Sequence, residues 1–334
     1  NEPTQPQPND HGYDWWMATQ NNAGPSHKNP NNFVRNGEKV GQLEGFSAPL
    51  VVEEAQTWLK KHRDPNRPFF ITVWTHEPHL PIESDPKFMA EYPGISDEGL
   101  KQHHGNVTQL DAAFGRLMRT LDELKLADNT VVFFTSDNGP EGSGLPDAAN
   151  PGSMRDRTRG STGGLRGRKR DCYEGGIRVP GIVRWPGHIQ AGVESNVPVI
   201  GSDIFSTICD IADIPLPADR TIDGASMLPA FAGKAIERSQ PLYWRTRIAK
   251  PDCRVALRLG DWKIVGNEDM SSLQLFNLAD DPRETTDLAS KNPEEFKRLQ
   301  AAILNMDSEV KASGSEWGKN EQPEDREKPK AKAK

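Results

Sequence analysis

The sequence has few cysteines, no surplus of positive charge and no long apolar run, and each absence excludes a class of protein. Its 334 residues include only Cys172, Cys209 and Cys253, an odd number without the close Cys or His spacing of a zinc site. Neither a disulfide framework nor a zinc module is therefore expected. Lysine and arginine total 41 against 48 aspartates and glutamates, a net charge of -7, so no nucleic-acid partner is expected. No apolar run approaches the roughly 18 residues that a membrane span needs.

The start of the chain lacks the pattern of a secretory signal peptide. It reads NEPTQPQPND, a stretch rich in proline, asparagine and glutamine that is typical of a loop inside a protein. The length favours one large domain and a smaller one. We expect the large domain over residues 1–240, a small α+β subdomain over 241–310, and a disordered charged tail over 311–334.

Two cycles of helix and strand predict an α/β fold for the large domain. Apolar residues recur at helical spacing from Leu50 to Leu59 and again from Val107 to Leu124. Each helix is followed by a continuous apolar segment, at 69–74 and at 130–134. Strands that are apolar on both faces are typical of a parallel sheet covered by helices. A mainly parallel sheet flanked by helices is therefore expected.

Polar side chains follow both predicted strands. His76 and His79 come after the first strand, and Asp137 and Asn138 come directly after the second. Since ligands of such sheets lie beyond the carboxyl ends of the strands, we expect these four residues on one rim.

Asp137 and Asn138 offer only hard oxygen ligands, in the sequence SDNGP. Such oxygens suit Ca²⁺ or Mg²⁺, although two residues are too few for a complete site. Aspartate, asparagine, glycine and proline are also typical turn residues, so the residues alone leave a metal site and a plain turn as alternatives.

The segment from Arg155 to Arg170 carries seven basic residues separated by glycines and small hydroxyl residues. Such a segment could bind an anionic group, with Lys169 as a point charge and the arginines as bidentate donors. Nucleic-acid contact is an alternative, although no aromatic residues interleave the run, and a solvated loop is another. These features together indicate a cation-assisted site for an anionic ester.

The part of the chain beyond residue 240 predicts a small antiparallel sheet and one helix. Short apolar segments separated by turn signals are PLYWRTR, CRVALRL, WKIVG and LQLFNL. An amphipathic helix follows, with Phe296, Leu299, Ile303, Met306 and Val310 on one face.

Five stretches, in this order, resemble the sulfatase family within the alkaline-phosphatase-like superfamily, particularly its arylsulfatase A and N-acetylgalactosamine-6-sulfatase branch. They are HGYDWW (11–16), PFFITVWTHEPHLPI (68–82), GNVTQLDAAFGRLMRTLDELKLADNTVVFFTSDNGP (105–140), GLRGRKRDCYEGGIRVPGIVRWPG (164–187) and LFNLADDPRETTDLA (275–289). The resemblance covers most of residues 11–290. It implies an alkaline-phosphatase-like sandwich with a small C-terminal antiparallel subdomain.

The resemblance also implies roles for individual residues. Asp137 and Asn138 match ligands of a calcium ion, for which magnesium is less favoured. Lys169 matches a lysine that holds a sulfate oxygen, and His79 matches the histidine that contacts the sulfate and the departing ester oxygen. His76 is the competing candidate for that histidine.

Other residues are candidates for the rim of the substrate site. They are His76, His104 and Arg168. His104 and its neighbour His103 also fit a purely structural role.

One departure from the family pattern is large. Sulfatases carry a formylglycine made from a cysteine or serine in a C/S-x-P/A-x-R motif, and none of the three cysteines or the serines here lies in such a motif. The early paired aspartates of the metal site are also absent. We expect the chain to be the C-terminal portion of a sulfatase, inactive by itself; a split gene or a pseudoenzyme that only binds sulfated glycans is the alternative.

The implied function is calcium-assisted hydrolysis of an aryl sulfate or a sulfated carbohydrate. The expected partner is a sulfated small molecule or glycan, and the resemblance implies export to the periplasm, the extracellular space or the lysosome. A phosphoesterase of the same superfamily is an alternative, which would use several histidine ligands at two metal ions.

Overall fold

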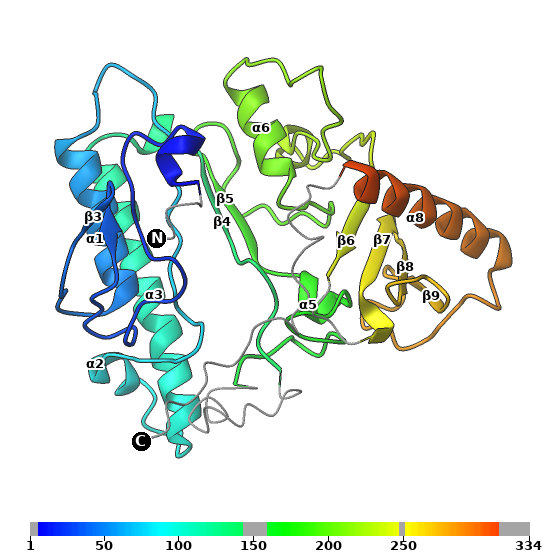
Figure 1. The fold of residues 1–334 in the computed structure, drawn as a ribbon, viewed down its shortest axis with the longest axis horizontal. Helices are drawn as coiled ribbons and strands as arrows, with labels where there is room; N and C mark the ends of the chain where they lie inside the picture. The colour runs from blue at the N-terminus through cyan, green and yellow to red at the C-terminus, as the bar shows by residue number, and fades with distance from the viewer. Residues whose placement is uncertain (1–5, 143–158, 247–250, 314–334) are drawn as a thin grey trace, which may run out of the picture. The chain divides into compact units, whose positions relative to one another are not determined.

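The computed structural model describes residues 6–142, 159–246 and 251–313, which divide into two compact units (Figure 1). The first unit contains Asn1–Gly164 and Arg178–Glu194, and the second contains Leu165–Ile177 and Ser195–Lys334. The short segment Leu165–Ile177 therefore belongs to a different unit from the residues on either side of it. The predicted domain boundary at residue 240 stays a prediction.

The first unit begins with short elements. They are η1 (Pro8–His11) and the strands β1 (Met17–Ala18), β2 (Val34–Arg35) and β3 (Glu38–Lys39). The three strands form an antiparallel sheet in sequence order. Arg35 of this sheet donates two hydrogen bonds to the carboxylate of Glu54, at 2.7 and 2.6 Å. This pair connects the sheet to the first long helix.

The helical patterns of the sequence form α1 (Ser47–Lys61) and α3 (Glu98–Glu123), with the short α2 (Pro86–Met89) between them. Val52 and Ala113 are buried in one cluster that joins the two long helices. The predicted apolar face of α3 is interrupted at Val107, which is 43% exposed. The helices are therefore where the spacing predicts them, although one residue of the face points to solvent.

The predicted strand at 69–74 is not assigned as a strand, and the segment pairs with no strand among the described residues. Its side chains alternate: Phe69 and Ile71 pack on the helices, whereas Phe70 and Trp74 are 60% and 82% exposed. The expectation of burial on both faces is therefore wrong for this segment. A continuous apolar run does not reveal whether a second layer covers its outer face.

The second predicted strand is β4 (Val132–Thr135), which follows the short η2 (Ala127–Asn129). It pairs with β5 (Gly181–Arg184) in antiparallel register, with Phe134 opposite Ile182. Every strand pair among the described residues is antiparallel, so the predicted parallel pairing is not found there. Apolar composition alone does not specify strand direction, because both directions use the same side chains.

The second unit contains the predicted antiparallel sheet, in the order β6 to β9. Its strands are β6 (Leu242–Arg245), β7 (Val255–Leu259), β8 (Trp262–Gly266) and β9 (Leu273–Asn277), with η3 (Pro251–Cys253) before β7. The predicted helix is α8 (Pro293–Ser313), whose Leu299 and Ile303 are fully buried against the sheet. The predicted tail was expected from residue 311, but α8 continues to Ser313, and the rest of the tail lies outside the described residues.

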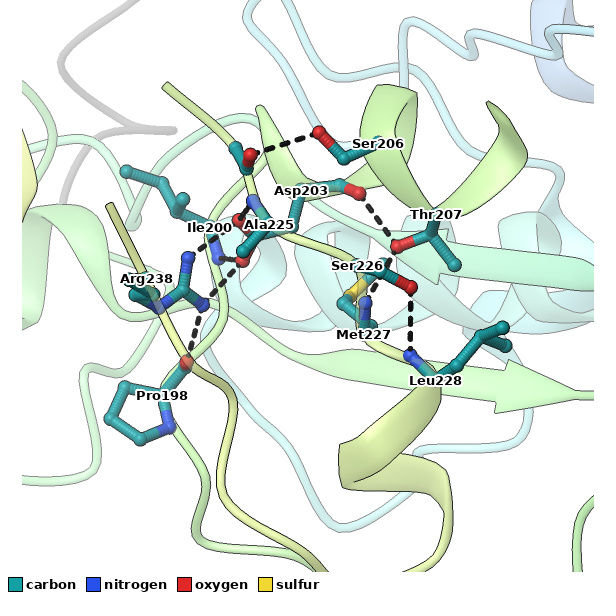
Figure 2. Close-up of polar contacts among 11 residues, drawn as sticks. Pro198, Ile200, Asp203, Ser206, Thr207, Ala225, Ser226, Met227, Leu228 and Arg238 are labelled. Carbon is teal, nitrogen blue, oxygen red and sulfur yellow. Dashed lines mark hydrogen bonds and ion pairs between the residues drawn. The ribbon is translucent and has the colours of Figure 1, made fainter. Parts of the chain in front are cut away.

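A buried Asp–Arg pair organises the part of the second unit around α6 (Asp203–Ile211) and α7 (Leu228–Phe231). The fully buried Asp203 carboxylate accepts hydrogen bonds from Nη1 and Nη2 of Arg238, at 2.6 and 2.7 Å (Figure 2). The same carboxylate accepts the N–H groups of Ile200 and Ala225, at 2.8 and 2.9 Å. Three loops are therefore attached to the start of α6 through one side chain, and no sequence motif indicated this.

Across the described residues, no helix is both long and apolar enough to cross a membrane.

Candidate functional site

The loop that carries His76 and His79 is fixed to the first unit by Glu77. This side chain is 4% exposed and accepts hydrogen bonds from Ser47 Oγ and from the N–H of Ala48, both at 2.9 Å. These donors lie in the first turn of α1, where backbone N–H groups lack helical partners and favour an anion. Burial raises the pKa of Glu77, and its hydrogen bonds oppose this in part. The loop is therefore held by a carboxylate at a helix N-terminus.

His79 is exposed and is oriented by its own backbone. Its Nδ1 lies 2.7 Å from the carbonyl oxygen of Leu80 and 3.2 Å from Asn22 Nδ2. The shorter contact assigns the proton to Nδ1, which leaves Nε2 as the acceptor nitrogen of the neutral ring. An exposed imidazole in this state can accept a proton at Nε2 and return it.

His76 is packed more deeply than His79. Its Nε2 lies 2.9 Å from Thr19 Oγ1, and its ring lies edge-on to Phe33 at 5.7 Å and beside His27 at 5.8 Å. Burial and the nearby His79 lower the pKa of His76, so its neutral form is favoured. These contacts give His76 a packing role.

His27 lies behind His76 and was not indicated by the sequence. It is fully buried, and neither ring nitrogen has a hydrogen-bond partner among the described residues. Burial first, and then His76 and His79, lower its pKa from 6.5 to about 4. A lone histidine in a loop of the sequence carries no signal that would have predicted this environment.

Asp137 and Asn138 lie in a bend that follows β4. Asp137 Oδ1 accepts the N–H of Asn138 at 2.9 Å, and Asn138 Nδ2 donates to the carbonyl of Gly139 at 3.0 Å. Asp137 is exposed. The chain therefore bends at these residues, and carboxylate and amide oxygens lie at the end of the strand.

These two residues make up only part of a metal site. Across the part of the chain that the structure describes, no group of three or more His, Cys, Asp or Glu side chains is arranged to hold a metal ion. Hard oxygens are the ligand type that Ca²⁺ prefers, but Ca²⁺ takes six to eight of them. The donor chemistry of Asp137 and Asn138 fits calcium, and the remaining ligands have to come from outside the described residues.

Lys169 lies in a turn of the second unit. The Asp171 carboxylate accepts the N–H of Arg168 at 3.0 Å, and the N–H of Asp171 donates to the carbonyl of Arg168 at 2.9 Å. Lys169 is half-buried, and its ammonium makes no ion pair with the residues that the structure describes. Residues 155–158 of the predicted basic segment lie outside the described residues.

His104, a candidate for the substrate rim, lies on α3 and contacts Leu100 and Tyr92. Its Nδ1 lies 2.9 Å from the carbonyl of Leu100, and its ring meets Tyr92 edge-on at 5.2 Å. These are contacts of a packed helical residue and agree with its structural alternative.

The candidate residues are divided between the two units. Arg168 and Lys169 lie in the second unit, and the other candidates lie in the first. Within the described residues, neither His76 nor His79 makes a hydrogen bond to Asp137 or Asn138. Their predicted convergence on one rim therefore stays a prediction.

The cysteines are buried, which disfavours the reactive thiolate of two of them. None of the three forms a disulfide, and all three are buried. Burial raises the pKa of Cys172 to about 12 and also raises the pKa of Cys253. Since the thiolate is the reactive form, the thiols of Cys172 and Cys253 are poorly suited to nucleophilic attack.

Comparisons with known proteins agree on one family. The chain is 28% identical over 307 residues to an N-acetylgalactosamine-6-O-sulfatase of Bacteroides thetaiotaomicron and 32% identical over 268 residues to the N-acetylgalactosamine-6-sulfatase of Canis lupus familiaris. These matches cover 84% and 76% of this chain but 57% and 47% of the relatives, so the chain spans about half the length of the curated relatives it matches.

Solved structures show the same fold. The crystal structure of Ps i-CgsB in complex with k-i-k-neocarrahexaose has a TM-score of 0.74 at 25% identity and covers 90% of this chain and 67% of that one. The structure of BT4656 in complex with its substrate D-glucosamine-2-N,6-O-disulfate has a TM-score of 0.71 at 18% identity, covering 94% of this chain and 79% of that one.

Two family models match the chain directly. The sulfatase model matches residues 1–214, and the model described as N-sulphoglucosamine sulphohydrolase, C-terminal, matches residues 167–311. Because the first model covers more than half of the sequence, and the order of motifs agrees with it, the chain belongs to the sulfatase family.

Proposed function

We propose that this chain is the C-terminal part of a calcium-assisted sulfuric ester hydrolase that removes sulfate from a sulfated carbohydrate. The match of the sulfatase model to residues 1–214 carries the proposal. The relatives named N-acetylgalactosamine-6-sulfatase support a carbohydrate substrate, and the steryl-sulfatase of Homo sapiens, 35% identical over 205 residues, supports a sterol sulfate as an alternative.

The nucleophile, a formylglycine, belongs to a segment upstream of Asn1 in this proposal. The printed sequence contains no C/S-x-P/A-x-R motif, and its cysteines are buried. The outer face of residues 69–74 supports an upstream segment, since Phe70 and Trp74 are 60% and 82% exposed there. Large apolar side chains exposed together favour a covering partner.

Asp137 and Asn138 would supply some of the oxygen ligands of the calcium ion through their side chains. When bound, the ion supplies positive charge to the sulfuryl oxygens as negative charge develops on them. The bend after β4 keeps the two side chains adjacent, because the Asp137 carboxylate accepts the N–H of Asn138 at 2.9 Å.

Lys169 and His79 act on the sulfate ester itself. The Lys169 ammonium binds a sulfuryl oxygen and compensates its charge. His79, with the proton of the neutral ring on Nδ1, has Nε2 as the nitrogen that gains a proton and delivers it to the departing ester oxygen. His76 packs within the same loop as His79, and Arg168 and His104 are proposed to line the substrate rim.

The test uses the whole protein, expressed from its coding sequence with the upstream segment included. Hydrolysis of 4-nitrophenyl sulfate and of 6-sulfated N-acetylgalactosamine is measured for the wild type and for Asp137→Ala. We expect Asp137→Ala to lower kcat/KM about 100-fold or more, because it removes a metal ligand. The matched control is Asp128→Ala, which removes an exposed carboxylate before β4 and should leave kcat/KM unchanged. Equal activity of Asp137→Ala and wild type would contradict the metal role.

A second candidate is a catalytically incomplete sulfatase-like protein that only binds sulfated glycans. The absence of the formylglycine motif from the printed sequence favours it. Binding of a sulfated oligosaccharide without release of sulfate, with the upstream sequence present, would select this alternative.

The proposal includes export of the whole protein, as the family resemblance implies. Fractionation of cells that express the complete coding sequence tests this, and retention in the cytoplasm would contradict it.

A further inference from the structure

Lys263 is completely buried in the middle of the second unit, on β8. Its Nζ lies 2.8 Å from Glu174 Oε1 and 2.9 Å from Glu284 Oε1. Both glutamates are also buried, at 3% and 0% exposure. A charged side chain is stable in a buried environment only when it is paired with an opposite charge. The three side chains therefore form one ion-pair cluster, here called the Lys263 triad.

The triad is attached to the segment that contains Lys169. Glu174 is the first residue of α5 (Glu174–Ile177), and its N–H donates to Glu284 Oε2 at 2.6 Å. Arg166 donates from Nη1 to the carbonyl of Glu284 at 2.9 Å, and its guanidinium lies 3.9 Å from the centre of the Tyr173 ring. Both ends of the segment 166–174 are therefore connected to Glu284.

The start and the end of this segment are joined by a backbone hydrogen bond, and its backbone packs closely against Gly175 and Gly176. The N–H of Gly175 donates to the carbonyl of Arg166 at 2.7 Å. A Cβ on Gly175 would lie 2.3 Å from the carbonyl oxygen of Gly167, and a Cβ on Gly176 would lie 2.1 Å from that of Asp171. The turn that carries Lys169 thus packs directly over Gly175 and Gly176, which leaves no room for a Cβ at either position.

We propose that Lys263 is a positioning residue, which together with Glu174 and Glu284 fixes the turn of Lys169 for contact with an oxyanion of the sulfate class. The proposal rests on the proposed role of Lys169. A lysine side chain is long and flexible, so the place of its ammonium depends on how firmly its backbone is held. Apolar packing is non-directional and would not fix the exact position of the turn. Two ion pairs to one buried ammonium fix the position of the Glu174 carboxylate, and therefore the position of the turn attached to it.

The test compares two glutamate-to-glutamine variants of the whole protein, expressed with its upstream segment included. Glu174→Gln keeps the shape of the side chain and removes one carboxylate of the triad, while Lys263 remains paired with Glu284 and the unit keeps its fold. Glu294→Gln is the matched control, because it removes a Glu–Lys ion pair, to Lys297 at 3.3 Å, on an exposed face of α8. Hydrogen exchange is followed by mass spectrometry in peptides from 165–177 and from β7.

We expect Glu174→Gln to speed exchange in 165–177 about 10-fold and to leave β7 unchanged, since only the local attachment is weakened. The control should change neither peptide. Equal exchange in the two variants would overturn the inference. Faster exchange in β7 to the same degree as in the turn would also overturn it, because the triad would then be a general core contact.

A second measurement reports binding and uses inorganic sulfate as the probe. The rate at which acetyl N-hydroxysuccinimide labels Lys169 is measured while the sulfate concentration is raised. We expect sulfate to protect Lys169 in the wild type and in Glu294→Gln, and Glu174→Gln to need about 10-fold more sulfate for half protection. Unchanged half protection in Glu174→Gln would overturn the inference.

The two measurements separate this inference from the proposed function. Absence of sulfate protection in the wild type, together with the expected change in exchange, would overturn the sulfate role of Lys169 and support the attachment of its turn by the triad. If the sulfate concentration for half protection of Lys169 is the same in Glu174→Gln and in the wild type, the sulfate role of Lys169 is supported. The inference that the Lys263 triad positions Lys169 is then overturned.

Discussion

Two of the segments that carry candidate site residues are held by buried glutamates in two different ways. In the first unit, Glu77 fixes the loop of His76 and His79 and receives hydroxyl and backbone N–H donors at 2.9 Å. In the second unit, Glu174 fixes the turn of Lys169 and receives a fully buried ammonium at 2.8 Å.

The difference follows from what surrounds each glutamate. Glu77 lies at the start of α1, a helix of 15 residues, where free N–H groups and the helix dipole stabilise a carboxylate without a cation. Glu174 starts α5, which has 4 residues and offers little dipole, so its charge is compensated by Lys263 from the sheet. A buried acid is thus tolerated in either setting, but removing its partner has unequal consequences.

The largest effect is expected for Lys263→Met. This change leaves the carboxylates of Glu174 and Glu284 buried without their cation, which costs about 3–5 kcal/mol in the free energy of unfolding of the second unit. Urea-dependent hydrogen exchange of β7 measures it. Lys297→Met, on the exposed face of α8, is the control and should cost less than about 1 kcal/mol. A loss below 1 kcal/mol for Lys263→Met would show that the two glutamates do not depend on this cation.

A second large effect is expected from acid in the first unit, which contains every histidine of the sequence. Burial of His27 lowers its pKa from 6.5 to about 4. Below pH 6.5 the unfolded chain binds a proton at His27 that the folded unit does not bind, so the free energy of unfolding decreases as the pH falls from 6.5 toward 4. The loss amounts to about 3 kcal/mol by pH 4. The raised pKa of Glu77 has the opposite sign, because its protonated form is favoured in the folded unit, so Glu77 does not add to the acid loss.

The variant that tests this is His27→Leu, with chemical unfolding of the first unit followed at several values between pH 7 and pH 4. We expect the slope of stability between pH 6.5 and 4 to flatten in His27→Leu. His188→Leu, which removes an exposed histidine of the same unit, should keep the slope. An unchanged slope in His27→Leu would remove His27 as the source.

A smaller effect is expected for Gly176→Ala, which pushes the turn of Lys169 away from α5. The added Cβ would lie 2.1 Å from the carbonyl oxygen of Asp171 and 2.5 Å from that of Arg168. Overpacking of this kind costs about 2 kcal/mol. Gly201→Ala is the control in the same unit, since a Cβ there meets no atom within 4 Å. Thermal unfolding compares the two, and an equal melting temperature would contradict the close wrapping of the turn.

The smallest effect is expected for Glu77→Gln. The amide oxygen can still accept the N–H of Ala48, and the Ser47 hydroxyl can rotate to accept from the new NH₂ group. The cost is about 1 kcal/mol, seen as faster hydrogen exchange in the loop 75–82. Glu53→Gln on the exposed side of α1 should leave that exchange unchanged. A loss as large as that of Lys263→Met would remove the distinction between the two modes of attachment.

Part of the fold was predictable because its signals are local. The alternating strands of the second unit, their turns and the helix that covers them follow from residues adjacent in sequence, and β6 to β9 and α8 lie where those patterns predict them. The bend at Asp137 and Asn138 was predictable for the same reason, because the residues that make its hydrogen bonds are neighbours. Their roles as ligands stay a prediction.

Other features depended on residues far apart in the chain. The direction of β4 is set by its partner β5, almost 50 residues later, and an apolar run is compatible with either direction. Lys263 in WKIVG has the sequence signature of an exposed strand position, yet it is fully buried, because its glutamates lie 89 residues before it and 21 residues after it.

The sequence by itself determined the family, the local helices and strands of each unit, and the chemical types of the candidate site residues, because these follow from residue identity and short-range spacing. Only the tertiary structure decided which charges are buried together, which histidine is packed and which is exposed, and how the turn of Lys169 is attached. The physical reason is that burial and ion pairing are properties of the neighbours in space, and periodicity along the chain contains no information about neighbours that are distant in sequence.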